Sequence, residues 1–161
     1  LFPTLNCNSG KTPLHYACEE GLLETSNALI GANPNVVDKS HHTPLHSAIE
    51  SNSLAVVTWL IQEAGAKIHG YAEKPFFHSS SFDIEASCMM PSTLMKLGIS
   101  PWETDPKGNT AMHYCCQRRC SDDESTDGVQ GGECRYEFLD ELVDHSPALL
   151  IAKNHLGATP L

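Results

Sequence analysis

Cysteine and histidine side chains, the usual ligands of zinc, gather in one short stretch of this 161-residue chain. His113 is followed by Cys115, Cys116, Cys120 and Cys134. A structural zinc ion is held by four such ligands in a tetrahedral arrangement. Whether these side chains could meet around one ion depends on the elements that position them.

The segment between the last two of these cysteines is acidic and partly fits a calcium-binding loop. Asp123, Ser125, Asp127 and Gly128 stand at positions 1, 3, 5 and 6 of that pattern. The pattern requires a bidentate glutamate at position 12, whereas Glu133 stands at position 11. Because a shift of one residue takes the carboxylate away from the ion, we expect a solvated acidic loop here.

A cysteine thiol beside a histidine base could also act as a nucleophile. A chain with seven cysteines and nine histidines offers such pairs by chance. No segment resembles the turn that presents a catalytic nucleophile or the glycine-rich loop that binds phosphate. The sequence therefore predicts no catalytic residue, no cofactor and no enzymatic activity.

Four of the histidines belong to a short phrase that recurs along the chain. The letters TPLH at 12–15 return at 43–46, PFFH at 75–78 and TAMH at 110–113 are relaxed copies, and TPL stands at 159–161. The successive steps are 31, 32, 35 and 49 residues. A period of about 20–50 residues is typical of solenoid proteins.

This pattern resembles the ankyrin repeat, a unit of about 33 residues that contains the phrase T-P-L-H-x-A. The flanking residues agree with the family at three offsets: an Asp or Asn before the threonine, a glycine before it, and an alanine after the histidine. They are Asp38, Asp105 and Asn154, then Gly108 and Gly157, then Ala17 and Ala48. The resemblance covers nearly the whole chain and implies an all-α solenoid of stacked helix-turn-helix units joined by short hairpin turns.

Helix physics agrees with this assignment. Threonine is a good N-cap because its hydroxyl accepts an orphan backbone N–H, and proline in the first turn loses no hydrogen bond. Farther along the second unit, apolar residues recur at helical spacing. They are Leu54, Val56, Val57, Leu60 and Ile61. We expect this stripe to be buried against neighbouring helices, and the glycine that follows to end the helix.

The repeat accounts for most of the candidate metal ligands. Cys115 and Cys116 fall on packed positions of a unit's first helix. The resemblance gives His113 a structural role, in hydrogen bonds between turns. Cys120 and Cys134 remain, which are too few for a structural zinc, so we expect no metal site.

The repeat also predicts where the units lie within a single segment, 1–161, of a longer array. About five units are expected, with truncated ends: 6–37, 38–69, 70–103, 104–153 and a partial unit at 154–161. In the third, Pro75 replaces the threonine and Pro91 stands where the second helix should begin, so we expect a distorted or shortened helix. In the fourth, an acidic, glycine-rich insertion near 120–134 predicts a mobile loop.

The family's contact positions lie at the hairpin tips and on the exposed, concave side of the first helix. The resemblance implies that the residues at these positions bind a protein partner. They are Lys11, Glu19 and Glu20 in the first unit, Lys39, Ser40, His42, Glu50 and Ser51 in the second, and Pro106, Lys107, Asn109, Gln117 and Arg118 in the fourth. Tyr71 and Lys74 are the nearest matches in the third.

Charge and composition limit the classes of partner that we expect. The formal charge of −10 repels phosphate backbones, so we expect no nucleic acid and no direct membrane contact. A basic partner surface is favoured, although solubility alone would explain the charge. The chain shows neither an apolar run long enough to span a membrane nor a signal peptide, and its cysteines are irregularly spaced. We therefore expect an intracellular protein, cytoplasmic or nuclear.

Two functions remain open from the sequence. One is a non-catalytic scaffold that binds another protein. The alternative is a regulatory or structural segment that packs against other domains of a larger multidomain enzyme or membrane channel. Fold alone does not decide between them.

Overall fold

A computed structural model describes residues 9–69, 75–78, 89–117 and 139–161. Within these ranges every regular element is a helix, which confirms the predicted all-α class. Several predicted features lie outside the described residues: the insertion near 120–134 with its partial calcium pattern, Cys120 and Cys134, and the contact positions Tyr71, Lys74 and Arg118.

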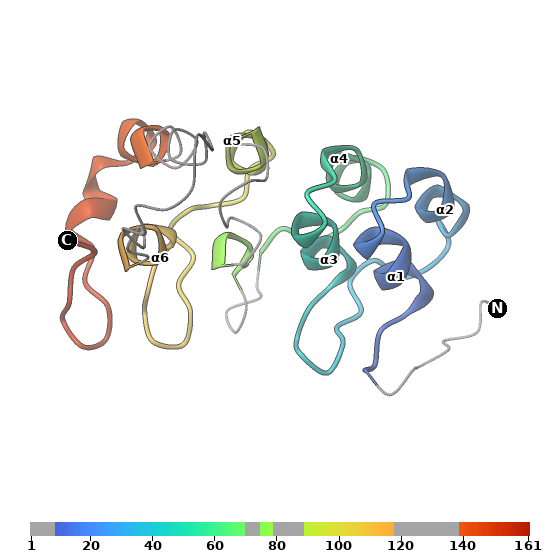
Figure 1. The fold of residues 1–161 in the computed structure, drawn as a ribbon, viewed down its shortest axis with the longest axis horizontal. Helices are drawn as coiled ribbons and strands as arrows, with labels where there is room; N and C mark the ends of the chain where they lie inside the picture. The colour runs from blue at the N-terminus through green and yellow to red at the C-terminus, as the bar shows by residue number, and fades with distance from the viewer. Residues whose placement is uncertain (1–8, 70–74, 79–88, 118–138) are drawn as a thin grey trace, which may run out of the picture.

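The helices are short and follow one another in pairs (Figure 1). Their bounds are α1 Pro13–Glu19, α2 Leu23–Ala28, α3 Pro44–Glu50, α4 Leu54–Gln62, η1 Phe76–His78, α5 Met89–Lys96, α6 Ala111–Gln117, a helix over 139–145, and η3 Pro147–Ile151. The helices α1 and α3 begin at the TPLH phrase, and α6 and η1 begin at its relaxed copies.

Figure 1 shows these helices in two rows. We call α1, α3, η1 and α6 the inner row, and α2, α4, α5 and the helix over 139–145 the outer row. Hairpin loops leave the inner row at the edge away from the outer row, and they all project in the same direction (Figure 1). This is the stacked arrangement that the resemblance implied.

Each clear copy of the phrase starts a helix by the same reciprocal cap. The threonine side chain caps the backbone of the histidine three residues later, and the backbone N–H of the threonine donates to that histidine's Nδ1. The latter distance is 3.1 Å between Thr12 and His15 and 3.0 Å between Thr43 and His46. The histidine thus performs the part that glutamate plays in the usual capping box.

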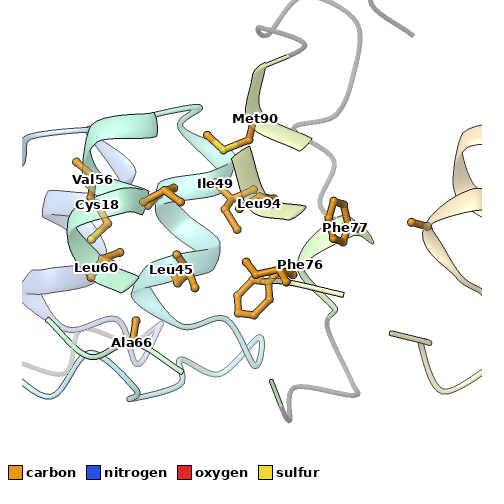
Figure 2. Close-up of a cluster of buried hydrophobic side chains, with 14 of the residues drawn as sticks. Cys18, Leu45, Ile49, Val56, Leu60, Ala66, Phe76, Phe77, Met90 and Leu94 are labelled. Carbon is orange, nitrogen blue, oxygen red and sulfur yellow. The ribbon is translucent and has the colours of Figure 1, made fainter. Parts of the chain in front are cut away.

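A single hydrophobic cluster runs through the stack from Leu14 to Leu149. The motif positions Leu14, Leu45 and Met112 are almost fully buried, and Ala48 lets the inner helices approach closely. Figure 2 shows this cluster between α3, α4, η1 and α5. The units are therefore joined by one continuous core rather than by separate small ones.

The predicted stripe of α4 is buried, with one addition. Val56, Val57 and Leu60 are buried, while Leu54 and Ile61 are partly buried against the same core. Trp59 is also buried, at 5% exposure, although the apolar spacing did not include it. Gly65, which follows α4, has a φ of 72°. This is the left-handed conformation expected of the glycine that ends the helix.

The third unit keeps its place in the stack with a shortened first helix. The described residues there form the 3₁₀ helix η1 rather than an α-helix, because Pro75 has no hydroxyl to cap one. Phe76 is fully buried and its ring stacks on His46, with centroids 4.3 Å apart. Figure 2 shows it within the same cluster of buried side chains as Leu45 and Leu94. Pro91 sits in the first turn of α5, where no intrahelical hydrogen bond is lost.

Candidate functional site

Three hairpins share one shape, which is set by an acidic or amide side chain. The Asp38 carboxylate accepts hydrogen bonds from the backbone N–H groups of Ser40 and His42, at 2.8 and 2.9 Å. Asp105 does the same for Lys107 and Asn109, and Asn154 for Leu156 and Ala158. Such Asx turns fix the loop backbone without help from the tip side chains.

A left-handed residue closes each of these hairpins. His41, Gly108 and Gly157 occupy the same place, with φ values of 62°, 78° and 76°. The backbone N–H of each donates to the carbonyl of the Asp or Asn that begins the hairpin, at 2.9–3.1 Å. The loops are therefore alike even where one of them uses a histidine in place of glycine.

Hydrogen bonds also join neighbouring hairpins. The backbone N–H of Lys39 donates to the carbonyl of Ser9 at 3.1 Å, and that of His155 donates to the carbonyl of Lys107 at 3.0 Å. The Asn154 amide donates to Asn109 Oδ1 at 2.9 Å. These bonds fix the hairpin at Asp38 against the segment at Ser9, and the hairpin at Asn154 against the one at Asp105.

The motif histidines bind the inner helices to the next hairpin. His15 Nδ1 accepts from a backbone N–H, so its Nε2 carries the proton and donates to the carbonyl of His42, at 3.0 Å. His113 Nε2 meets the carbonyl of Ala158 in the same way, at 3.1 Å. Burial lowers the pKa of His15 below its ordinary value, which favours this neutral form. These contacts give the motif histidines the structural role that the ankyrin resemblance implied, which is hydrogen bonding between turns.

Two of the predicted contact pairs lie on the exposed face of the inner row. Lys11 Nζ is 2.8 Å from Glu19 Oε2, and this hydrogen bond raises the pKa of the lysine. At the same offset in the second unit, His42 Nδ1 is 3.7 Å from Glu50 Oε1. Each pair places a carboxylate at the end of an inner helix and a nitrogen at its start.

Two other predicted contact residues make contacts within the chain. The Ser51 hydroxyl donates to the carbonyl of Cys18 in the preceding unit, at 2.8 Å. The Asn109 amide donates to Asp105 Oδ2 at 3.1 Å and its oxygen accepts from Asn154. Both side chains help to hold neighbouring segments together.

The remaining predicted residues are at the surface. Glu19, Glu20, Lys39, Ser40, Glu50, Pro106 and Lys107 are exposed. Gln117 is the last residue of α6. The lysines of this group lie on the hairpins of the second and fourth units, and the glutamates lie at the ends of the inner helices of the first and second units.

Sequence reasoning missed Tyr114, which supports the fourth-unit hairpin. Its hydroxyl donates to Asp105 Oδ2 at 2.6 Å. Burial opposes ionisation of Asp105, but the hydrogen bonds from Tyr114, Asn109 and the backbone of Lys107 outweigh it and lower the pKa of the carboxyl. The one available signal was that Tyr114 and Tyr16 stand at the same offset from the motif threonine.

No cluster of three or more histidine, cysteine or acidic side chains suited to a metal occurs among the residues that the structure describes. Cys18 is fully buried, and burial raises the pKa of its thiol to about 11, so it is a poor nucleophile. Cys116 is half-buried. In the same part of the chain, no helix is both long and apolar enough to cross a membrane.

Comparison with known proteins adds to this geometry. Residues 2–71 match the model of the family described as ankyrin repeats, in three copies. Rabankyrin-5 of Homo sapiens is 31% identical over 121 residues, which cover 72% of this chain and 10% of that protein. The E3 ubiquitin-protein ligase KEG of Arabidopsis thaliana is 28% identical over 120 residues, covering 70% of this chain and 7% of the ligase.

Rabankyrin-5 of Mus musculus is 38% identical over a shorter stretch of 61 residues, which is 37% of this chain and 5% of that protein. The chain thus spans a tenth or less of the length of these curated relatives. With the paired helices, the histidine caps and the repeated hairpins, the matches establish that this chain belongs to the ankyrin-repeat family.

Proposed function

We propose that this chain is a non-catalytic module that binds a protein partner through its hairpin tips and the exposed ends of its inner helices. Ankyrin repeats in general are protein–protein interaction modules. The proposal implies an intracellular location, where the cysteines stay reduced.

One observation supports the proposal most strongly: the hairpin backbone is held from within. Asp38 and Asp105 fix the two hairpins through their own side chains, so Lys39, Ser40 and Lys107 make no side-chain contact that the loops need. A loop backbone that is already fixed loses little conformational freedom on binding, which favours affinity.

The charged residues of this surface indicate which charges a partner would carry. Lys39 and Lys107 at the hairpin tips would attract acidic groups on a partner. The helix-end residues Glu19, Glu20 and Glu50 would attract basic groups. A partner that carries both signs would match this surface. Ser51 and Asn109 contribute less to this surface, because their side chains hold neighbouring segments together.

The test is a triple charge reversal, Lys39→Glu, Glu50→Lys and Lys107→Glu, in a chain used as bait for partner capture and cross-linking. We expect the captured proteins to be lost while Tm changes by no more than about 2 °C, since the three side chains are exposed. The matched control reverses Glu24, Lys67 and Lys96, which are exposed outside the hairpin tips, with the same net change in charge. Undiminished capture by the triple variant, or loss only when the chain unfolds, would refute the proposal.

A second function is favoured by the lengths of the relatives. Because the chain spans a tenth or less of them, it could pack against other domains of a larger protein and regulate or support them. Hydrogen exchange of residues 38–42 and 105–109 would distinguish the two. Protection of these hairpins by the protein's own further domains would favour this alternative, and exchange as fast as in the isolated chain would exclude it.

A further inference from the structure

The outer row contains a groove that the proposed function does not use. It lies between α2 and α4, has a volume of about 490 Å³, and is open to solvent. Its walls come from one face of each helix: Leu23, Asn27, Leu54, Ala55, Thr58, Trp59, Gln62 and Glu63. Apolar and polar side chains both line it.

The groove exists because the two rows pack differently. The inner helices α1 and α3 pack closely over small residues such as Ala17 and Ala48, while α2 and α4 share far fewer contacts. Leu23, at 39% exposure, faces the open space that results. An exposed leucine is ordinary by itself, but this one lines the same groove as the buried Trp59.

The charge around the groove has one sign. The two helices that form the groove, α2 and α4, contain Glu24 and neither lysine nor arginine. Glu63 stands at the end of the groove itself and is exposed. A partner that enters this groove therefore meets an acidic surface, and basic residues on it would be attracted.

We propose that the groove binds an amphipathic helix of a partner protein, which inserts an apolar side chain between α2 and α4 and places a lysine or arginine near Glu63. The volume lies within the range of about 300–1,000 Å³ typical of ligand sites. The nine residues of α4 extend over about 13 Å, so two to three turns of a partner helix would cover the groove. This surface is separate from the hairpin edge, so its test is independent of the one above.

Trp59 provides a local readout. The chain has two tryptophans, and Trp102→Phe removes the one outside the groove. The probe is a synthetic 14-residue helix of leucine and lysine, with an isomeric peptide of the same composition but no apolar face, and a third peptide with glutamate in place of lysine. We expect the first peptide alone to shift the Trp59 emission in the Trp102→Phe chain, with an affinity that falls as salt is raised.

Two matched variants locate the binding. Ala55 lines the groove and Ala28 does not, and both are exposed on outer helices. Ala55→Arg fills the groove and adds a positive charge, so we expect it to weaken the peptide by about tenfold or more. Ala28→Arg adds the same charge away from the groove and should change affinity less than about twofold. Glu63→Gln should weaken the lysine peptide and leave the glutamate peptide unaffected.

Several results would overturn the proposal. They are the absence of a Trp59 shift at millimolar peptide, equal binding of the lysine and glutamate peptides, and equal effects of the two arginine variants. Binding that is lost in the triple charge-reversal variant of the hairpin edge but kept in Ala55→Arg would assign the peptide to the other surface. It would refute the groove without refuting the proposed function.

Discussion

Gly108 and Gly157 have nearly the same backbone conformation but different surroundings. A Cβ at Gly108 would lie 2.9 Å from the backbone nitrogen of His155, whereas a Cβ at Gly157 would meet nothing within 4 Å. Their φ values of 78° and 76° impose the same left-handed strain on any L-residue. The pair therefore separates strain from steric overlap.

We predict that Gly157→Ala lowers the free energy of unfolding by about 1–2 kcal/mol through conformational strain alone. Gly108→Ala should cost distinctly more, because the hairpin that begins at Asn154 must also move away from it. Urea denaturation of both variants measures the difference. If both variants lose the same free energy of unfolding, His155 moves aside at no cost. The hairpins would then be less tightly joined than the hydrogen bonds between them indicate.

The sequence predicted which positions face solvent better than it predicted which side chains form hydrogen bonds within the chain. The position of Ser51 just after an inner helix suggested a contact residue, yet its hydroxyl reaches a carbonyl of the preceding unit. Tyr114 shares its offset from the motif threonine with Tyr16, but this offset does not identify its partner Asp105, which stands nine residues earlier and across a turn. Single hydrogen bonds between segments depend on packing that spacing alone does not encode.

At the scale of elements, His15 joins α1 to the hairpin of the next unit. Burial lowers its pKa below the ordinary value of 6.5. Between the two pKa values the unfolded chain binds more protons than the folded one. The stability contributed by the neutral histidine is therefore fully present above pH 6.5 and is lost as the pH falls toward the folded-state pKa.

We predict that the free energy of unfolding decreases as the pH falls from 6.5, and that His15→Gln makes this decrease smaller. The variant should also be less stable at pH 7.5 by about 1–3 kcal/mol, because the Thr12 N–H and the His42 carbonyl lose a buried partner. Urea titrations at several pH values test this, with the exposed His145→Gln as control. An unchanged pH dependence in His15→Gln would contradict the assignment.

The helices themselves were predictable where local chemistry was complete. Threonine and histidine at fixed offsets specified the starts of α1, α3 and α6, with proline as a further signal at α1 and α3, and the periodic apolar residues specified α4. At η1 the capping threonine is missing, and sequence reasoning could foresee a shortened helix but not that Phe76 would stack on His46. The unit boundaries at 6–37, 38–69, 70–103 and 104–153 stay predictions.

At the scale of the molecule, the continuity of the core depends on a few side chains at the third unit. Phe76 is fully buried between the inner helices on either side, and Met90 and Leu94 approach the same cluster from α5 (Figure 2). In a stack of repeats, stability is the sum of each unit and of the interfaces between neighbours. A weak interface would let the two sides unfold separately.

We predict that Phe76→Ala lowers stability by about 3–5 kcal/mol and separates unfolding into two transitions. In a Trp102→Phe background, Trp59 emission reports the second unit, while circular dichroism reports all helices. The two curves should coincide in the parent and diverge in Phe76→Ala, and Phe76→Leu should restore most of the agreement. Coincident curves in all three chains would show that the third unit is not the weak interface.

The way the hairpins are held determines which of their residues can be substituted. Asp38, Asp105 and Asn154 determine loop shape from inside the turn, and the side chains of Lys39, Ser40 and Lys107 take no part in it. Tip residues can therefore be exchanged in any combination without altering the backbone that presents them. A library randomised at these tips should yield folded variants with new binding preferences, because architecture and recognition are encoded by different residues.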